Sequence, residues 1–203
     1  MVFWMSAFLI YLGFLGWYYN WSGPIKPDEI DGLIDRLDNS SGSAHTDTKV
    51  MRRFLEEDDG KEFVMQNFVR FPEGDIKHPV TGELSSPRSV LMNYFRPFAL
   101  ALLKGGGHPV FQARTVGGLI DSWGGGSGPA WHGIGMMRYR SRRQLVQLAS
   151  DKRFSEIHIF KLAAINATEN YPTQMLMSFN LRPSLYVPLV LALIASLLQN
   201  FLS

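Results

Sequence analysis

Four arginines lie close together in the second half of the chain, at Arg138, Arg140, Arg142 and Arg143. If residues 131–140 form a strand, Arg138 and Arg140 share one face, because side chains alternate along a strand. Arg142 and Arg143 then enter the first turn of a helix, where unpaired backbone N–H groups add positive potential. Such a cluster can contact a partner or lipid headgroups, pair with acids of the same domain, or bind a small anion. We favour contact with a partner or headgroups.

The five histidines are the other residues whose chemistry could matter: His45, His78, His108, His132 and His158. None has the spacing of a helical metal site, so we predict no metal and no cofactor. His108 follows three glycines at the start of an expected strand and is the best candidate for a general base or a haem ligand. His132 could face a pocket together with Arg138. His108, His132 and Arg138 are weak catalytic candidates. For His108 we favour the simpler interpretation of a histidine that is hydrogen-bonded at a strand end.

Several classes of chemistry are excluded or unsupported. The chain has no cysteine, which excludes thiolate catalysis, disulfides and thiolate metal sites. It has no Gly-x-Ser-x-Gly motif, and the glycine-rich run at 124–129 lacks the Lys-Ser/Thr ending of a phosphate-binding loop. A nucleic-acid partner is not expected, because the net charge is only +2 and no aromatic platform accompanies the arginines. We therefore regard enzymatic activity as uncertain and do not favour it.

The elements that position these residues are set by an uneven distribution of charge. All 38 charged side chains lie between Lys26 and Arg182. The uncharged run Val2–Trp21 has 20 residues, and a helix rising ~1.5 Å per residue would then cover the ~30 Å hydrocarbon core of a bilayer. The uncharged segment after Arg182 is of similar length and also apolar. The sequence predicts two transmembrane helices, at 1–22 and 184–203.

The first span has features that suit packing in a membrane. Its aromatic residues suit packing against lipids, pigments or quinones, and its small residues allow close approach of a neighbouring helix. The residues expected to pack there are Trp4, Gly13, Gly16, Trp17 and Trp21. Basic residues flank the two spans only on the side of the central domain, at Lys26, Arg36 and Arg182. The positive-inside rule then places the domain in the cytoplasm, which in a bacterium means at the inner membrane.

Between the spans, residues 23–60 read as an acidic helical linker and residues 61–180 as an α+β domain. Strands are expected at 61–71, 108–119, 131–140 and 169–179, because aromatic and β-branched residues are frequent there. Helices are expected from Ser86, from Ser141 and over 154–165. The resulting β-α-β-β-α-β order predicts a ferredoxin-like domain flanked by the two transmembrane helices. Helices would cover one face of its sheet, and a second copy of the chain, a partner or the linker helices would cover the other.

The domain also resembles a known family. The segments that carry the resemblance are 61–71 (KEFVMQNFVRF), 79–82 (PVTG), 105–111 (GGGHPVF) and 138–144 (RYRSRRQ). They are similar to uncharacterised dimeric α+β-barrel proteins related to EthD-like and antibiotic-biosynthesis-monooxygenase-like domains, over roughly residues 49–178. The resemblance implies a sheet that can form a homodimer and an oxidising or isomerising activity on a lipophilic substrate. Membrane anchors are an addition to that family.

Two functions are therefore expected. The favoured one is a non-catalytic accessory or structural subunit of a larger membrane complex, of respiratory or photosynthetic type, with lipids and other integral membrane subunits as partners. Uncharged spans support it, because ionisable residues within the membrane usually mark transport pathways. The alternative is a membrane-anchored α+β-barrel enzyme or binder for a lipophilic small molecule. For that alternative, the expected lining residues are Met65, Asn67, His108, Met137 and Tyr139.

Overall fold

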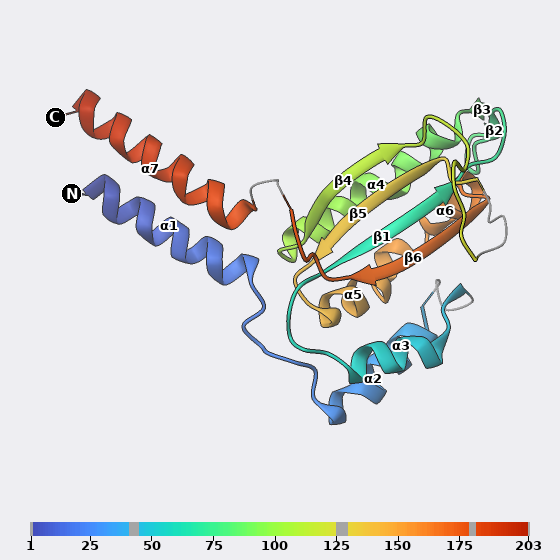
Figure 1. The fold of residues 1–203 in the computed structure, drawn as a ribbon, viewed down its shortest axis with the longest axis horizontal. Coiled ribbons are helices and arrows are strands. Elements are labelled where there is room, and N and C mark those ends of the chain that lie inside the picture. Colours follow the sequence, from blue (N-terminus) through green and yellow to red (C-terminus); the bar gives the residue numbers. More distant parts are fainter. Residues whose placement is uncertain (1, 41–44, 125–129, 179–181, 203) are drawn as a thin grey trace.

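The computed structural model describes residues 2–40, 45–124, 130–178 and 182–202, and shows a mixed α+β fold (Figure 1). The elements in chain order are α1 (Val2–Tyr18), α2 (Pro27–Asp38), α3 (Thr48–Glu56), β1 (Phe63–Arg70), β2 (Ile76–Lys77), β3 (Leu84–Ser85), α4 (Pro87–Lys104), β4 (His108–Arg114), β5 (Gly133–Tyr139), α5 (Arg142–Ala149), the 3-10 helix η2 (Lys152–Phe154), α6 (His158–Ala164), β6 (Ala167–Thr173) and α7 (Pro183–Leu202). All four main strands and the helices between them overlap the segments that the sequence predicts. Strand β4 ends at Arg114, where 119 was expected. Strand β6 covers Ala167–Thr173, where 169–179 was expected, and residue 179 lies outside the described residues.

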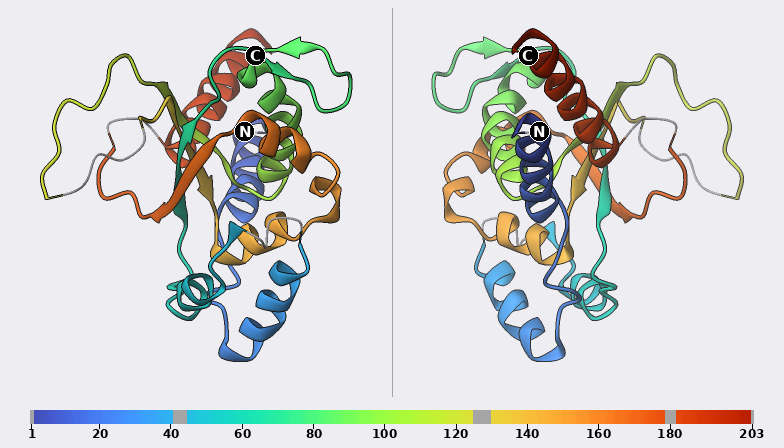
Figure 2. Two further views of the ribbon diagram at one scale, coloured as in Figure 1. Left: turned by 90° about the vertical axis from the view of Figure 1, so that its right-hand side faces the viewer. Right: turned by 90° about the vertical axis from the view of Figure 1, so that its left-hand side faces the viewer.

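The main sheet of the described residues has four antiparallel strands in the order β4-β5-β1-β6. Helices α4, α5 and α6 cover one face of this sheet (Figure 2). Phe63 pairs with Tyr139 and Met65 with Met137, so these side chains share the helix-covered face. The core on this face contains Phe63, Leu102, Met137, Tyr139, Leu148 and Phe154. Removal of this apolar surface from water holds the helices on the sheet.

In the described part of the chain, no helix covers the middle of the opposite face of the sheet (Figure 2). Phe68 lies on it and contacts Trp131 and Tyr171, with ring centroids 5.9 and 6.1 Å apart. Phe111 pairs with Met136 on the same face. The side chains of Phe111 and Tyr171 are 46% and 52% exposed. The sheet thus presents a partly apolar face to its surroundings.

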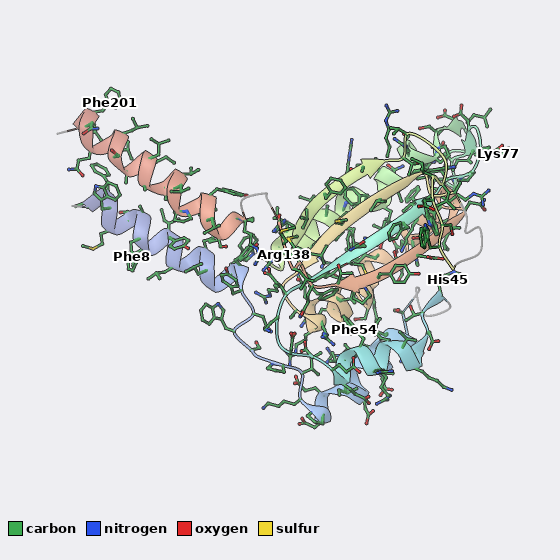
Figure 3. All side chains as sticks on the ribbon, viewed as in Figure 1. Phe8, His45, Phe54, Lys77, Arg138 and Phe201 are labelled. Atoms are coloured by element: carbon green, nitrogen blue, oxygen red, sulfur yellow. The ribbon has the colours of Figure 1, made fainter. Side chains whose placement is uncertain are left out.

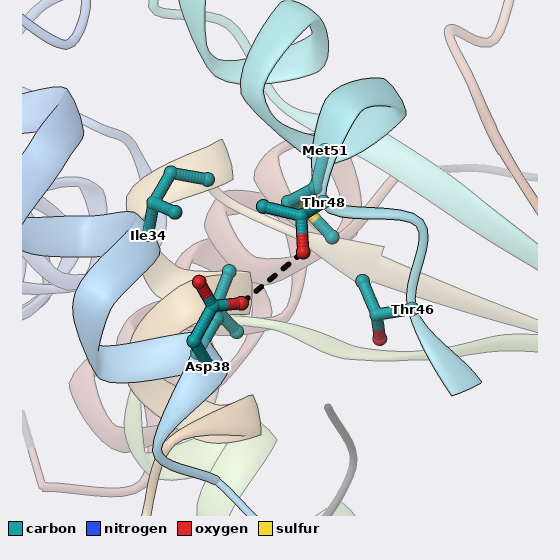
Figure 4. A pocket seen from close by; sticks show the side chains of 6 residues that line it. Ile34, Asp38, Thr46, Thr48 and Met51 are labelled. Carbon is teal, nitrogen blue, oxygen red and sulfur yellow. Dashed lines mark hydrogen bonds between the residues drawn. The ribbon is translucent and has the colours of Figure 1, made fainter. Parts of the chain in front are cut away.

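Helices α2 and α3 form a small separate layer beside the sheet (Figure 1). Their core consists of Ile30, Leu33, Ile34, Leu37 and Leu55 with Ile25 and Val146. Asp47 caps α3 by accepting from the backbone N–H groups of Lys49 and Val50. In the groove between the two helices, the Thr48 hydroxyl donates to Asp38 Oδ1 at 3.2 Å (Figure 4). The groove encloses essentially no volume, so it joins two helices and offers no ligand site.

Helices α1 and α7 lie side by side and extend together away from the sheet (Figure 1). They run antiparallel, because Trp4 Nε1 donates to Gln199 Oε1 at 2.7 Å and the Tyr11 hydroxyl donates to Ser184 O at 3.0 Å. In the described residues, α7 has 20 residues with mean hydropathy 2.0 and is the helix long and apolar enough to cross a membrane.

Helix α1 is shorter than the sequence predicts, because the apolar run that contains it has 20 residues. It ends at Tyr18 after 17 residues. The side chain of Asn20 donates to Gly23 O and Gly60 O, which fixes the chain after Tyr18 as a turn. Trp21 lies outside the helix, is 71% exposed, and donates to Leu15 O. The aromatic end of the predicted span therefore forms the connection to α2.

Candidate functional site

Arg138 lies where the paired helices meet the sheet (Figure 3). Its side chain is 4% exposed and forms an ion pair with Glu62, with N–O distances of 2.8 and 2.5 Å. It also donates to the carbonyl oxygens of Gly106 at 2.6 Å and Tyr18 at 3.1 Å. The guanidinium carbon lies 3.7 Å from the centre of the Tyr18 ring. One buried cation thus joins α1, β1, β5 and the loop after α4.

The other three arginines of the cluster also bind within the chain. Arg140 donates to Trp17 O at 3.1 Å. Arg142 pairs with Asp58 at 3.3 Å, donates to Phe54 O and lies over the Phe54 ring.

Arg143 pairs with Glu29 at 2.8 Å. The ion pairs of Arg142 and Arg143 thus join the start of α5 to the acidic linker, residues 23–60. This geometry favours internal pairing for all four arginines over the expected contact with a partner or headgroups.

A cavity of about 440 Å³ opens beside Arg138, between the start of β1, the start of β4 and the first turn of α7. Its polar wall contains Tyr18, Lys61, Glu62, His108, Arg138 and Arg182. Its apolar wall contains Val64, Val110, Met175, Leu176, Pro183 and Tyr186. The volume lies within the ~300–1,000 Å³ range of small-molecule sites. We call this space the junction cavity.

His108 is the histidine that the structure places in the junction cavity. It pairs across the strands with Arg138, its Nδ1 lies 2.9 Å from Pro109 O, and its ring stacks with Tyr18 at 5.9 Å. The Tyr18 hydroxyl lies 3.4 Å from His108 Nε2. In a neutral imidazole, Nδ1–H donates to Pro109 O and Nε2 accepts from Tyr18. Burial and, to a smaller extent, the Arg138 charge lower the pKa of His108 below 6.5.

This lowered pKa predicts acid sensitivity. The unfolded chain takes up the histidine proton first as the pH falls, so the contribution of neutral His108 is fully present above about pH 6.5 and is lost below it. We expect the melting temperature of the wild type to fall between about pH 7.5 and pH 5. His108→Gln should reduce that fall, because glutamine does not titrate. Thermal unfolding of both proteins across this pH range tests the prediction. An equal fall in melting temperature for the wild type and for His108→Gln would contradict it.

The remaining predicted site residues are placed elsewhere. His132 precedes β5, at the opposite end of that strand from Arg138, and its Nδ1 accepts from Phe71 N at 3.1 Å. The prediction that His132 shares a pocket with Arg138 is wrong, because five residues of extended strand separate them.

Met65, Met137 and Tyr139 belong to the helix-covered core, and Asn67 donates to Met65 O and Gly135 O. Of the five expected lining residues, His108 alone is among those that line the junction cavity. Within the described part of the chain, no group of three or more His, Cys, Asp or Glu side chains could hold a metal ion.

Sequence reasoning missed Glu62 as the partner of Arg138 and Tyr18 as part of the site. Glu62 lies one residue before β1 and Arg138 one residue before the end of β5. The strand register, which pairs Phe63 with Tyr139, brings their side chains together. A single acid at the start of an apolar strand is a recognisable signal. Its partner can be found only once the register is known.

Comparison with known proteins establishes the fold alone. No family model matches the chain, and no curated protein matches it. Two solved structures do: the RPA0582 protein of unknown function from Rhodopseudomonas palustris, with a TM-score of 0.53, and methylated RPA0582 protein, with a TM-score of 0.54. Each is 20% identical, and each match covers 66% of this chain and 96% of the other. About a third of this chain therefore has no counterpart in those structures.

Proposed function

We propose that this protein is a non-catalytic accessory subunit of a larger membrane complex, of respiratory or photosynthetic type, in which α1 and α7 anchor a ferredoxin-like domain. The observation that carries the proposal is the fixed joint between helices and sheet. Arg138 and Arg140 bind the backbone at the end of α1, and Trp17 Nε1 donates to Lys104 O at 3.0 Å. Such a joint holds the domain in one orientation at the membrane, which suits a structural subunit.

The outer surface of α1 supplies a contact for neighbouring helices in this proposal. Gly13 and Gly16 are exposed, and no atom of the described residues would lie within 4 Å of a Cβ added at either position. They are therefore not needed for packing against α7. Small residues allow close contact between membrane helices. The free face of the sheet is the surface that a second copy of the chain or another subunit would cover.

Substitution of both glycines tests the proposal. Gly13→Leu with Gly16→Leu should leave the chain folded and membrane-bound, because the added atoms meet open space. Association with a neighbouring subunit should fall at least tenfold, because about 1.4 kcal/mol of lost packing suffices for that. Gentle detergent purification with mass spectrometry measures it. Gly32→Leu, at an exposed glycine of α2 with the same open surroundings, is the control. Migration of the wild type as a free monomer or homodimer would refute the proposal.

The proposal includes two spans, with the domain in the cytoplasm. Lys26, Arg36 and Arg182 support this orientation by the positive-inside rule. The chain lacks cysteine, so single cysteines can be introduced as clean reporters. We expect an impermeant thiol reagent to label Asn200→Cys but not Asp75→Cys in intact cells. Labelling of Asp75→Cys alone would reverse the orientation, and labelling of both would show that α7 does not cross.

A second candidate function is favoured by the junction cavity. A membrane-anchored α+β-barrel binder or enzyme would hold a lipophilic molecule there, with His108 and Tyr18 as its polar groups. The resemblance to EthD-like and monooxygenase-like domains would imply an oxidising or isomerising activity. Stabilisation of the purified protein by members of a lipophile panel, lost in His108→Ala, would support this candidate. No bound chromophore and no stabilisation across the panel would count against it.

A further inference from the structure

The junction cavity lies at the level of the lipid headgroups if α1 and α7 cross the bilayer, and this inference rests on that part of the proposed function. Tyr18 is the last residue of α1, and Pro183 and Tyr186 belong to the first turn of α7. All three line the cavity. The cavity is therefore bounded by the domain on one side and by the ends of both membrane helices on the other.

The charges of the cavity favour an anion. Its wall contains Lys61, Arg138 and Arg182 as cations and Glu62 as the acid, a balance of three to one. Arg138 is buried and committed to Glu62. Arg182 is 48% exposed and lies 3.4 Å from the same carboxylate, and Lys61 is 74% exposed and lies 3.8 Å from Asp59 Oδ2. Both contacts are exposed and therefore weak, so either cation can exchange its carboxylate for an anionic ligand in the cavity.

The apolar wall continues along the surface of α7. Tyr186 lines the cavity and is 44% exposed. Val190 and Leu193 follow it at spacings of four and seven residues, which places them on the same side of the helix. They are 49% and 60% exposed. An acyl chain could therefore leave the cavity and remain in contact with a continuous apolar stripe.

A second apolar feature lies at the same place. Met175 and Leu176 line the cavity from the segment after β6, and Leu176 is 98% exposed. Met177, next to it, is 77% exposed. Exposed large apolar side chains beside a polar site are typical of contact with a membrane or a lipophilic ligand.

We propose that the junction cavity binds one anionic phospholipid, with its phosphate between Arg182 and Lys61 and its acyl chains along the stripe Tyr186–Val190–Leu193. The cavity accommodates the head group, and the chains remain outside it in the bilayer. This assignment differs from the Arg138–Arg143 cluster, whose guanidinium groups bind within the chain. The bound lipid would lie at the place where α1 and α7 meet the α+β domain.

The test uses the full-length protein in detergent, titrated with phosphatidylglycerol and followed by native mass spectrometry. Lys61→Gln with Arg182→Gln should weaken binding of the first lipid roughly twentyfold, because each basic residue near an anionic surface contributes about fivefold. Arg53→Gln with Lys77→Gln, which removes the same charge far from the cavity, should leave it within about twofold. Equal weakening in both double variants would overturn the proposal, because binding would then follow net charge alone.

A second pair of variants separates the cavity from surface charge. Val110→Trp fills the cavity from β4, Met175→Trp fills it from the segment after β6, and neither changes the charge. Each should weaken the first lipid at least tenfold while a circular dichroism spectrum shows the fold retained. Unchanged affinity in both folded variants would overturn the proposal.

Two controls identify the ligand and separate this inference from the proposed function. Phosphatidylcholine should bind at least tenfold more weakly than phosphatidylglycerol, and inorganic phosphate alone should not raise the melting temperature. Stabilisation by inorganic phosphate equal to that by the lipid would mean that a free anion is the ligand and would overturn the lipid assignment. Release of the chain from membranes by alkaline carbonate would refute the two spans, whereas the detergent titration still reports on the cavity.

Discussion

Gly106→Ala is expected to lower the free energy of unfolding by about 2–5 kcal/mol. Gly106 has a φ of +84°, and a Cβ there would lie 2.4 Å from Trp17 O and 3.1 Å from the Arg140 side chain. The left-handed backbone costs a non-glycine residue about 1–2 kcal/mol, and overpacking costs about 1–3 kcal/mol more. The backbone atom belongs to α1, so relief of the clash would move α1 away from the sheet.

Gly74→Ala is the matched control for this prediction. Gly74 also has a positive φ, of +70°, but no atom of the described residues would lie within 4 Å of its Cβ. Gly74→Ala should lower the free energy of unfolding only by the cost of the left-handed backbone, about 1–2 kcal/mol. Thermal or denaturant unfolding of both variants in the same detergent measures the difference. Equal losses in the free energy of unfolding would show that close packing of α1 against the loop after α4 adds nothing to the effect of Gly106→Ala.

Local composition and capping residues were sufficient to predict the elements of the α+β domain. Aromatic and β-branched residues indicated the strands, and Ser86 and Ser141 cap helices by accepting from the backbone N–H group three residues later. These are local signals, because each depends on residues close in the chain. The two short strands β2 and β3 were not predicted, since two residues are too few to show a period.

The site was harder to predict because its contacts are distant in sequence. The four arginines are close together in the sequence, but a run of charges does not show which acids its members meet. Arg138 pairs with Glu62 across 76 residues, and Arg143 pairs with Glu29 across 114. Similarly, aromatic residues at the end of α1 indicated a membrane interface. The sequence did not indicate that Tyr18 would stack on His108 and Arg138, because that contact requires the helix to be placed against the sheet.

Arg138→Met should cost about 3–5 kcal/mol, the usual range when one partner of a buried ion pair is removed. The variant leaves the carbonyl groups of Gly106 and Tyr18 without their donor and weakens the hold on Glu62. Glu62→Gln should cost less, because Arg138 keeps both carbonyl contacts and the Tyr18 ring.

Arg53→Gln provides the control for removal of an arginine. Arg53 is 79% exposed and pairs with Glu57 at a spacing of four residues, a type of contact that contributes only about 0.3–0.5 kcal/mol. Unfolding in detergent measures the loss of stability in Arg138→Met, Glu62→Gln and Arg53→Gln. Proteolysis between Tyr19 and Lys26 adds a second measurement, because the loss of Arg138 should free this connection while loss of Arg53 should not. Arg138→Met could instead lower the free energy of unfolding no more than Arg53→Gln and leave the connection protected. The joint between α1 and the sheet would then not depend on the buried arginine, and the structural role proposed for the chain would lose its main support.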